Sequence, residues 1–179
     1  TSVQVDTQIS GKIEQYDNSL VIGGINLLTN PTFSVDTKNW SGTGTSKIVV
    51  DNTCPLEDKN VTELTNPGTT WLGFTQTSLL LNSIMNPSSI TSSVYIRTVA
   101  GTGKMRFNNG GVSTTGSNEI AIDTTWKRVN LVQTRTTGTV NCFIQANTSF
   151  RIANAQLEIG SKMTAWGYPD KDIQLSLQA

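Results

Sequence analysis

The chain of 179 residues contains no histidine, and this limits the chemistry that its side chains can perform. Histidine is the commonest general base and metal ligand, so neither a Ser-His-Asp nor a Cys-His arrangement can form within this chain. Acidic side chains could supply the two carboxylates of a glycosidase, but they fall mostly in predicted turns or at strand ends and no pair stands out. We therefore expect no catalytic residues and no enzyme activity.

Sugar binding requires less, and residues suited to it lie on predicted strands. A pyranose has apolar C–H faces and a rim of hydroxyls, so a site needs one or two aromatic rings beside planar hydrogen-bonding groups. Side chains alternate between the two faces of a strand. Within residues 90–97, inward-facing Val94 and Ile96 would therefore place Tyr95 and Arg97 together on an outer face.

The same alternation applies to residues 140–147, where it buries Cys142 and Ile144. The residues then left on the outer side are Asn141, Phe143, Gln145 and Asn147. Within residues 70–74 the phase is ambiguous, but an inward-facing Leu72 and Phe74 would leave Trp71 outside.

Six residues are thus predicted to bind carbohydrate on one aromatic and polar face. They are Trp71, Tyr95, Arg97, Phe143, Gln145 and Asn147. The alternative for each is a ring or amide that merely covers a sheet face or a loop. A phase error of one residue reverses the prediction for a whole strand.

The composition excludes some partners. Thirteen basic and thirteen acidic side chains cancel, so no electrostatic footprint for nucleic acid or an anionic membrane exists. No apolar run approaches the ~20 residues that a membrane-spanning helix needs, so no membrane insertion is expected. Cys54 and Cys142 fit no metal-binding spacing. Two buried free thiols are favoured for them over a disulfide.

Short apolar or alternating runs, separated by Gly, Pro, Asn and Asp, fill the chain from residue 25 onward. Strands are predicted near 25–29, 45–51, 60–65, 70–81, 89–98, 103–108, 118–123, 126–135, 139–146 and 149–159. Short strands at this spacing, with no alternating helices, predict an antiparallel β-sandwich rather than a parallel α/β fold.

The first 24 residues follow a different pattern. Five apolar residues recur there at helical spacing: Val5, Ile9, Ile13, Tyr16 and Leu20. They indicate an amphipathic helix that ends at Gly23-Gly24, and the alternative is an extended linker. Such a helix would have no partner in a sandwich and would pack against its own copies, for example in a homotrimer. Residues 170–179 are expected to form an exit strand or a linker.

Two phrases bracket the predicted sandwich. Residues 26–33 read Asn-Leu-Leu-Thr-Asn-Pro-Thr-Phe, with Trp40 shortly after, and residues 155–166 read Ala-Gln-Leu-Glu-Ile-Gly-Ser-Lys-Met-Thr-Ala-Trp. Together they resemble the first and last strands of the β-jelly-roll carbohydrate-binding modules found in bacteriophage tail proteins and many glycoside hydrolases. The resemblance covers residues 25–169. It implies an all-β fold, a jelly-roll β-sandwich of two antiparallel sheets.

The closing phrase resembles the phage tail versions in particular. The resemblance therefore implies a non-catalytic carbohydrate-binding module of a phage tail or baseplate protein that adheres to host cell-wall or capsular polysaccharide. Its other partners would be phage tail proteins, and its location the virion tail after assembly in the bacterial cytoplasm. Two alternatives stay open: a structural or assembly domain that binds no sugar, and an accessory binding domain of a cell-wall hydrolase.

The resemblance also suggests structural roles. It implies that Trp40, Trp126 and Trp166 pack against the sandwich. Many members of the family hold a structural calcium ion between the first and last strands, and the matching positions here are Asn30, Thr32 and Glu158. Asn154-Ala155 replaces the acidic pair often present in the last strand, which weakens the case for calcium. No other cofactor is expected.

Overall fold

The structure is a computed structural model that describes residues 26–41, 45–77, 89–108, 119–134 and 139–167. The expected helix or linker over residues 1–24 and the expected exit segment over 170–179 lie outside the described residues. Within the described ranges, no helix is long and apolar enough to cross a membrane.

The described residues form nine β-strands. They are β1 (Thr45–Val50), β2 (Asn60–Asn66), β3 (Leu72–Thr77), β4 (Ser89–Thr98), β5 (Gly103–Asn108), β6 (Glu119–Ile122), β7 (Lys127–Thr134), β8 (Thr139–Ile144) and β9 (Thr148–Ile159). These bounds agree with the predicted strands to within a few residues, with two exceptions. One is the first predicted strand, and the other is the part of the predicted strand 70–81 that lies beyond residue 77, outside the described residues.

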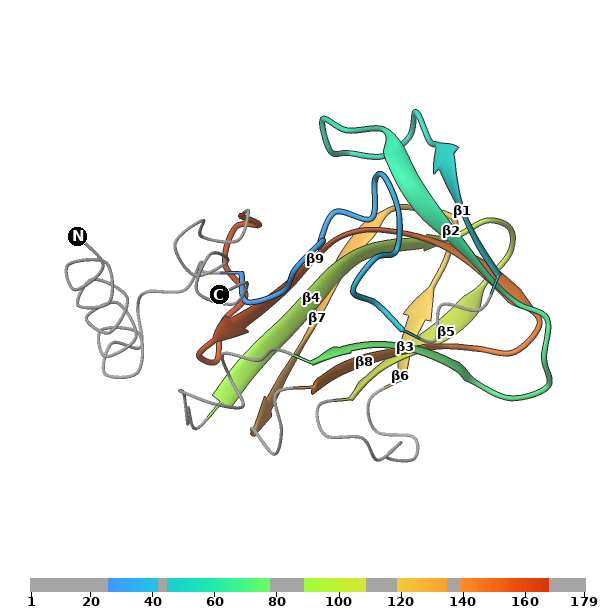
Figure 1. The fold of residues 1–179 in the computed structure, drawn as a ribbon. Helices are drawn as coiled ribbons and strands as arrows, with labels where there is room; N and C mark the ends of the chain where they lie inside the picture. Colours follow the sequence, from blue (N-terminus) through green and yellow to red (C-terminus); the bar gives the residue numbers. More distant parts are fainter. Residues whose placement is uncertain (1–25, 42–44, 78–88, 109–118, 135–138, 168–179) are drawn as a thin grey trace.

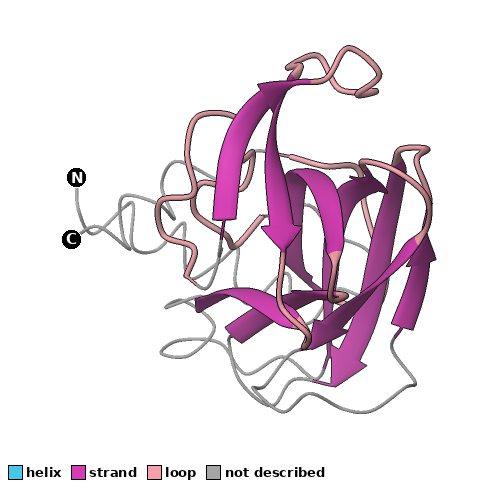
Figure 2. Cartoon of the chain, turned by 90° about the vertical axis from the view of Figure 1, so that its right-hand side faces the viewer, coloured by secondary structure: helices cyan, strands magenta, loops and turns pink. Residues whose placement is uncertain are grey.

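The strands form two antiparallel sheets that pack face to face (Figures 1 and 2). The five-stranded sheet has the order β1-β2-β9-β4-β7, and the four-stranded sheet has the order β3-β8-β5-β6. Most neighbours in each sheet are distant in sequence, as in β4 beside β9 and β3 beside β8. The predicted jelly-roll sandwich of two antiparallel sheets is confirmed.

The core lies between the sheets and is built by alternate residues of each strand. From the five-stranded sheet, the side chains of Val94 and Ile96 are fully buried. From the four-stranded sheet, Phe74, Cys142 and Ile144 face them in the same apolar cluster. Burying a large apolar side chain contributes about 1.5–3 kcal/mol, so this cluster determines which face of each strand turns inward. The inward directions predicted for Val94, Ile96, Cys142 and Ile144 are therefore confirmed, and the buried Phe74 gives the phase of residues 70–74, which the sequence left ambiguous.

The two bracketing phrases lie side by side. The Leu27 amide donates to the Leu157 carbonyl at 2.9 Å, and the Ala155 amide donates to the Pro31 carbonyl at 2.8 Å. β2 pairs only with residues Thr148–Ile152 of β9, so the rest of that β9 edge is open to the opening phrase. The segment near residues 25–29 was predicted to be a strand. Its described part is instead an irregular segment held along β9.

Two of the tryptophans stabilise this arrangement. Trp40 is buried with its ring 4.7 Å from the ring of Phe33 and 5.7 Å from that of Phe74, between ring centroids. Its indole N–H donates to the Asn30 carbonyl at 3.1 Å. The indole N–H of Trp166 donates to the Ala155 carbonyl at 3.1 Å, which ties the closing segment to β9. The predicted packing roles of Trp40 and Trp166 are confirmed.

Cys54 and Cys142 are buried free thiols, as predicted. Burial raises the pKa of both thiols, because the interior disfavours the charged thiolate. Neither cysteine is therefore prepared for nucleophilic chemistry.

Candidate functional site

The outer face of the four-stranded sheet carries aromatic and charged side chains that lie next to one another. Cys142 and Ile144 of β8 point into the core, so Phe143 between them points outward. Phe143 lies opposite Gly73 of β3 on one side and opposite Arg106 of β5 on the other. Residues directly opposite each other on antiparallel strands share a face, so the three positions form a row across the sheet.

Trp71 and Arg106 are stacked. The guanidinium carbon of Arg106 lies 3.9 Å from the centroid of the Trp71 ring, within the range of a cation–π contact. Arg106 also pairs with Glu119 on β6, and the Lys104 ammonium lies 3.3 Å from the same carboxylate. Hydrogen bonds from Arg106 and Lys104 hold the pKa of Glu119 below its usual range, so this carboxylate is ionised at neutral pH.

Gly73 makes room for the Phe143 ring. A Cβ atom at Gly73 would lie only 2.6 Å from Cε1 of Phe143, closer than real Cβ contacts allow. Because glycine has no Cβ, the ring rests directly against the backbone of β3. The local sequence Trp71-Leu72-Gly73 therefore supplies one ring at the start of β3 and the space for a second ring beside it.

Sequence reasoning missed Arg106, Lys104 and Glu119. Alternation in residues 103–108 would have placed Lys104 and Arg106 outside, since Met105 between them is fully buried. No local sequence pattern could indicate that these residues lie beside Trp71 and Phe143, because that position depends on the pairing of β5 with β8.

The six predicted carbohydrate-binding residues do not share one face. Trp71 and Phe143 belong to the four-stranded sheet, whereas Tyr95 and Arg97 lie on β4 in the five-stranded sheet. The expectation of a single face was therefore wrong. Alternation gives the face of a strand but not the sheet to which the strand belongs.

Arg97 does point outward, but its guanidinium belongs to a largely buried ion cluster. Its Nε donates to Oδ2 of Asp51 at 2.7 Å, and Arg151 contacts the same oxygen at 3.0 Å. Arg151 also pairs with Glu63 at 3.0 Å. Burial by itself raises the pKa of Asp51, but hydrogen bonds from Thr53, Arg151 and Arg97 outweigh it and hold the pKa well below its usual range.

The side chain of Tyr95 also packs against other residues of the protein. Its ring lies against the buried cluster of Cys54, Val61 and Ala153 on the outer side of the sheet. The guanidinium carbon of Arg128 lies 5.7 Å from the ring centroid. A role in sugar binding for Tyr95 and Arg97 stays a prediction, and packing and ion pairing account for both side chains in this geometry.

Gln145 and Asn147 lie in the turn from β8 to β9. The backbone amide of Gln145 donates to the backbone carbonyl of Lys104 at 3.1 Å, so the turn begins beside β5. Asn147 is exposed and has a φ of 54°, a left-handed conformation that asparagine tolerates better than most residues. Their role in binding stays a prediction.

The predicted calcium ligands make bonds within the protein. The Asn30 amide donates to the side chain of Asp36 at 2.9 Å and to the Lys38 carbonyl at 2.9 Å. The buried Glu158 carboxylate accepts hydrogen bonds from Gln156 and Thr164, both at 2.7 Å. Thr32 shares a hydrogen bond with Ser34. No group of three or more His, Cys, Asp or Glu residues gathers within the described ranges, so this donor set does not favour calcium.

No protein-family profile matches the chain, and no curated protein matches it in sequence. In structure it is similar to the CBM22-1 xylan-binding domain of Paenibacillus barcinonensis Xyn10C, with 17% identity and a TM-score of 0.54, over 78% of this chain and 97% of that domain. It is also similar to the CBM22-1–CBM22-2 tandem domain of the same xylanase, with 16% identity and a TM-score of 0.55, over 82% of this chain and 48% of the tandem.

A further similarity is to the enzymatically active domain of tailspike protein 4 of bacteriophage CBA120. It has 18% identity and a TM-score of 0.49, over 74% of this chain and 21% of the tailspike chain. At these identities the likeness to the two xylanase domains concerns the fold alone, and the tailspike similarity carries no argument. The chain has the jelly-roll fold of carbohydrate-binding modules.

Proposed function

We propose that this chain is a non-catalytic carbohydrate-binding module and that the outer face of the four-stranded sheet binds the sugar. The observation that carries the proposal is the group of Trp71, Arg106 and Phe143. Two partly exposed aromatic rings and a planar guanidinium lie together on a sheet of jelly-roll topology. This combination supplies the apolar surface and the planar hydrogen-bonding groups that a pyranose requires.

In this proposal the stacked Trp71 and Arg106 form one part of the binding surface, and Phe143 extends that surface along the sheet. Glu119 holds the guanidinium in place through their ion pair. A sugar would lie against the rings with its C–H faces, while its hydroxyls would bond to Arg106, Glu119 and Lys104. Since the Arg106 guanidinium covers one face of Trp71, a sugar that stacks on that face must displace it.

Catalysis is not part of the proposal. Glu119 is the carboxylate assigned to this face, and it is held ionised by two cations. A glycosidase needs a second carboxyl group with a raised pKa to protonate the leaving group. The absence of histidine from the whole sequence further supports a binding role.

The setting that we propose is a phage tail or baseplate. It rests on the closing phrase, residues 155–166, which resembles the phage tail versions of the module. The partners would then be host cell-wall or capsular polysaccharide and other tail proteins, with copies of the chain associating as a homotrimer. An accessory module of a cell-wall hydrolase would use the same face on a different parent protein.

Retention of the protein by polysaccharides tests the binding face. Wild-type protein should be retarded by at least one polysaccharide in affinity electrophoresis across plant, bacterial cell-wall and capsular types. Trp71→Ala and Phe143→Ala should abolish most of that retardation with little change in melting temperature, because both rings are partly exposed. Lys47→Ala, on β1 of the other sheet, is the control and should bind as wild type.

Absence of retention on every polysaccharide, including in a multivalent fusion that raises avidity by about 10²–10⁴-fold, would overturn the proposal in favour of a structural or assembly domain. Binding of the same fusion to intact bacterial cells would support the phage setting. Calcium is tested separately: a melting temperature that does not change when a chelator is added would exclude a structural ion.

A further inference from the structure

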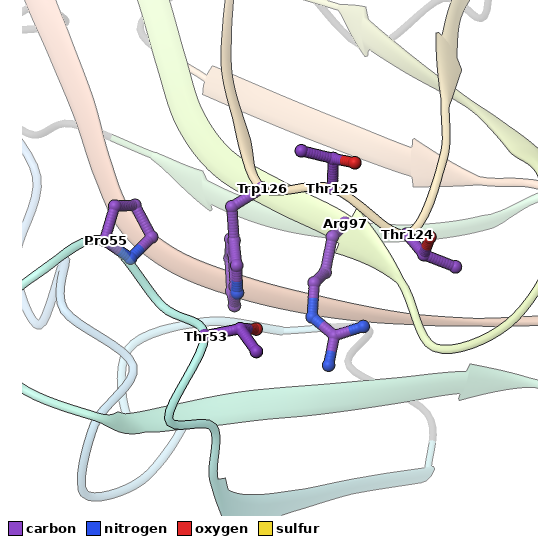
Figure 3. A pocket seen from close by; sticks show the side chains of 6 residues that line it. All are labelled: Thr53, Pro55, Arg97, Thr124, Thr125 and Trp126. Carbon is purple, nitrogen blue, oxygen red and sulfur yellow. The ribbon is translucent and has the colours of Figure 1, made fainter.

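A pocket lies at one end of the outer face of the five-stranded sheet, on the side of the molecule opposite the face proposed above. Its volume is about 430 Å³, which falls within the range of about 300–1,000 Å³ for small-molecule sites. Three segments contribute to it: the loop after β1 with Thr53 and Pro55, the end of β4 with Arg97, and the loop before β7 with Thr124, Thr125 and Trp126 (Figure 3).

Trp126 forms an aromatic wall of this pocket. Its ring packs against the cluster of Cys54, Val61 and Ala153, which holds it in place from behind. The guanidinium carbon of Arg97 lies 5.9 Å from the ring centroid, and Figure 3 shows the two side chains next to each other, both extending toward Thr53. A ring held on one side and facing a pocket on the other is a surface prepared for stacking.

The indole N–H of Trp126 is buried and has no hydrogen-bond partner among the described residues. An unsatisfied buried donor is unfavourable by about 1–3 kcal/mol, and the N–H groups of Trp40 and Trp166 both have partners. An oxygen atom of a ligand that enters beside the ring would remove this penalty. Trp126, which lines the pocket, therefore carries a buried donor that the described part of the fold leaves unsatisfied.

The charge of the pocket points to a neutral ligand. Asp51 binds Arg97 through Nε and through a terminal nitrogen, both at 2.7 Å, so its carboxylate neutralises the cation beside the pocket. The remaining polar groups on the rim include the hydroxyls of Thr124 and Thr125, which are exposed residues. Uncharged hydroxyls beside an indole ring suit a sugar better than a phosphate or a carboxylate, which would require an unpaired cation.

We propose that this pocket is a second site, independent of the four-stranded sheet, that binds a single neutral pyranose against Trp126. The C–H face of the sugar lies on the indole ring, and its hydroxyls bond to Thr124, Thr125 and the indole N–H. The site is bounded by two loops and the end of β4, so it has room for fewer sugar units than the open sheet surface of the other face. It therefore recognises a terminal sugar unit rather than the middle of a long chain.

The test is nuclear magnetic resonance of the indole N–H groups in the full chain, with the Trp126 signal identified by its loss in Trp126→Phe. The probes are glucose, galactose, mannose, xylose and N-acetylglucosamine, each added up to its solubility limit. At least one of them should shift the Trp126 signal in a saturable manner. The same shift should occur in Trp71→Ala, because the two sites are independent.

Thr125→Phe keeps Trp126 but fills the pocket, and it should weaken the apparent affinity by about tenfold or more, a change of about 1.4 kcal/mol. Thr45→Phe places the same bulk on an exposed threonine of β1 and should bind as wild type. The proposal is overturned if no sugar shifts the Trp126 signal, if the shift persists in folded Thr125→Phe, or if Trp71→Ala removes it. Loss of polysaccharide retention in Trp71→Ala with an intact Trp126 shift separates the two sites.

Discussion

At the scale of single residues, two glycines leave room for phenylalanine rings because they lack a Cβ atom. Gly73 does so on the surface of a sheet, and Gly103 does so in the core. A Cβ at Gly73 would meet the ring of Phe143 at 2.6 Å, and one at Gly103 would meet Cζ of Phe150 at 2.7 Å. Phe143 is partly exposed and can rotate away, whereas Phe150 is fully buried in the core and cannot. The same substitution should therefore affect binding at one site and stability at the other.

We predict that Gly103→Ala lowers the free energy of unfolding by about 1–3 kcal/mol, the usual effect of overpacking a core. Gly73→Ala should lower it by less but should weaken polysaccharide retention, because the Phe143 ring is displaced. Urea denaturation and affinity electrophoresis of both variants check this. Equal stability losses, or full retention in Gly73→Ala, would contradict the proposed role of Phe143.

Asp51 is the residue on which the ion cluster depends, since it contacts both Arg97 and Arg151. Asp51→Asn leaves the partly buried Arg97 guanidinium without its counter-ion and leaves Arg151 with Glu63 alone. Breaking a buried ion pair lowers the free energy of unfolding by about 3–5 kcal/mol. Because the side chains of Arg97 and Arg151 are still 12% and 21% exposed, we predict a decrease near the lower end of this range, about 3 kcal/mol. Thermal denaturation at neutral pH measures it.

The lowered pKa of Asp51 also predicts how stability depends on pH. A carboxyl group with a folded-state pKa below its unfolded value of about 3.9 contributes stability above pH ~4, and this contribution is lost as the pH falls toward the folded-state pKa. Wild-type protein should therefore lose stability below about pH 4. Asp51→Asn should lose less over the same range. Parallel pH profiles for the two proteins would show that Asp51 does not carry the effect.

At the scale of elements, the contact between the opening phrase and β9 joins the two ends of the described chain. Asn26 is central to it: its side-chain amide donates to the Ala155 carbonyl at 2.8 Å, and its side-chain oxygen accepts from the Leu28 and Leu157 amides at 3.2 Å. The residue is completely buried. This one side chain therefore replaces several of the hydrogen bonds that a regular strand would make.

Asn26→Ala should accordingly destabilise the domain by about 3 kcal/mol, because it leaves buried backbone groups without partners. Asn130→Ala, on the exposed side of β7, is the matched control and should change stability by no more than about 0.5 kcal/mol. Urea denaturation of both variants decides the matter. A neutral Asn26→Ala would mean that water satisfies the freed groups.

At the scale of the whole molecule, the sandwich and the first 24 residues are predicted to act separately. If the apolar stripe of residues 5–20 associates with its own copies, deletion of residues 1–24 should lower the oligomeric mass while the β-domain still melts cooperatively. Light scattering and circular dichroism on both proteins test this. Equal masses would indicate that the segment is a linker or that the sandwich carries its own interface.

The strands and their inward faces followed from the sequence because they depend on local information. Val94 and Ile96 flank Tyr95, and Cys142 and Ile144 flank Phe143, so alternation alone determined which side chains point outward. The two bracketing phrases likewise indicated the jelly-roll fold, and their packing tryptophans, Trp40 and Trp166, lie where the resemblance placed them. Turn residues and strand lengths explain why most strand bounds were predicted to within a few positions.

Which outward side chains meet depends on how the strands pair across the molecule. β4 pairs with β9 and β7, whereas β3 pairs with β8, so Tyr95 and Phe143 lie on opposite sides of the molecule although both alternate outward. Arg106 reached Trp71, and Asp51 reached Arg97, through pairings between strands distant in sequence. Such pairings are selected by the fit of the whole core and by the closure of long loops, and no local pattern of residues carries that information. The fold class and the outward faces of β4 and β8 therefore followed from the sequence, whereas long-range packing brought the outward side chains together.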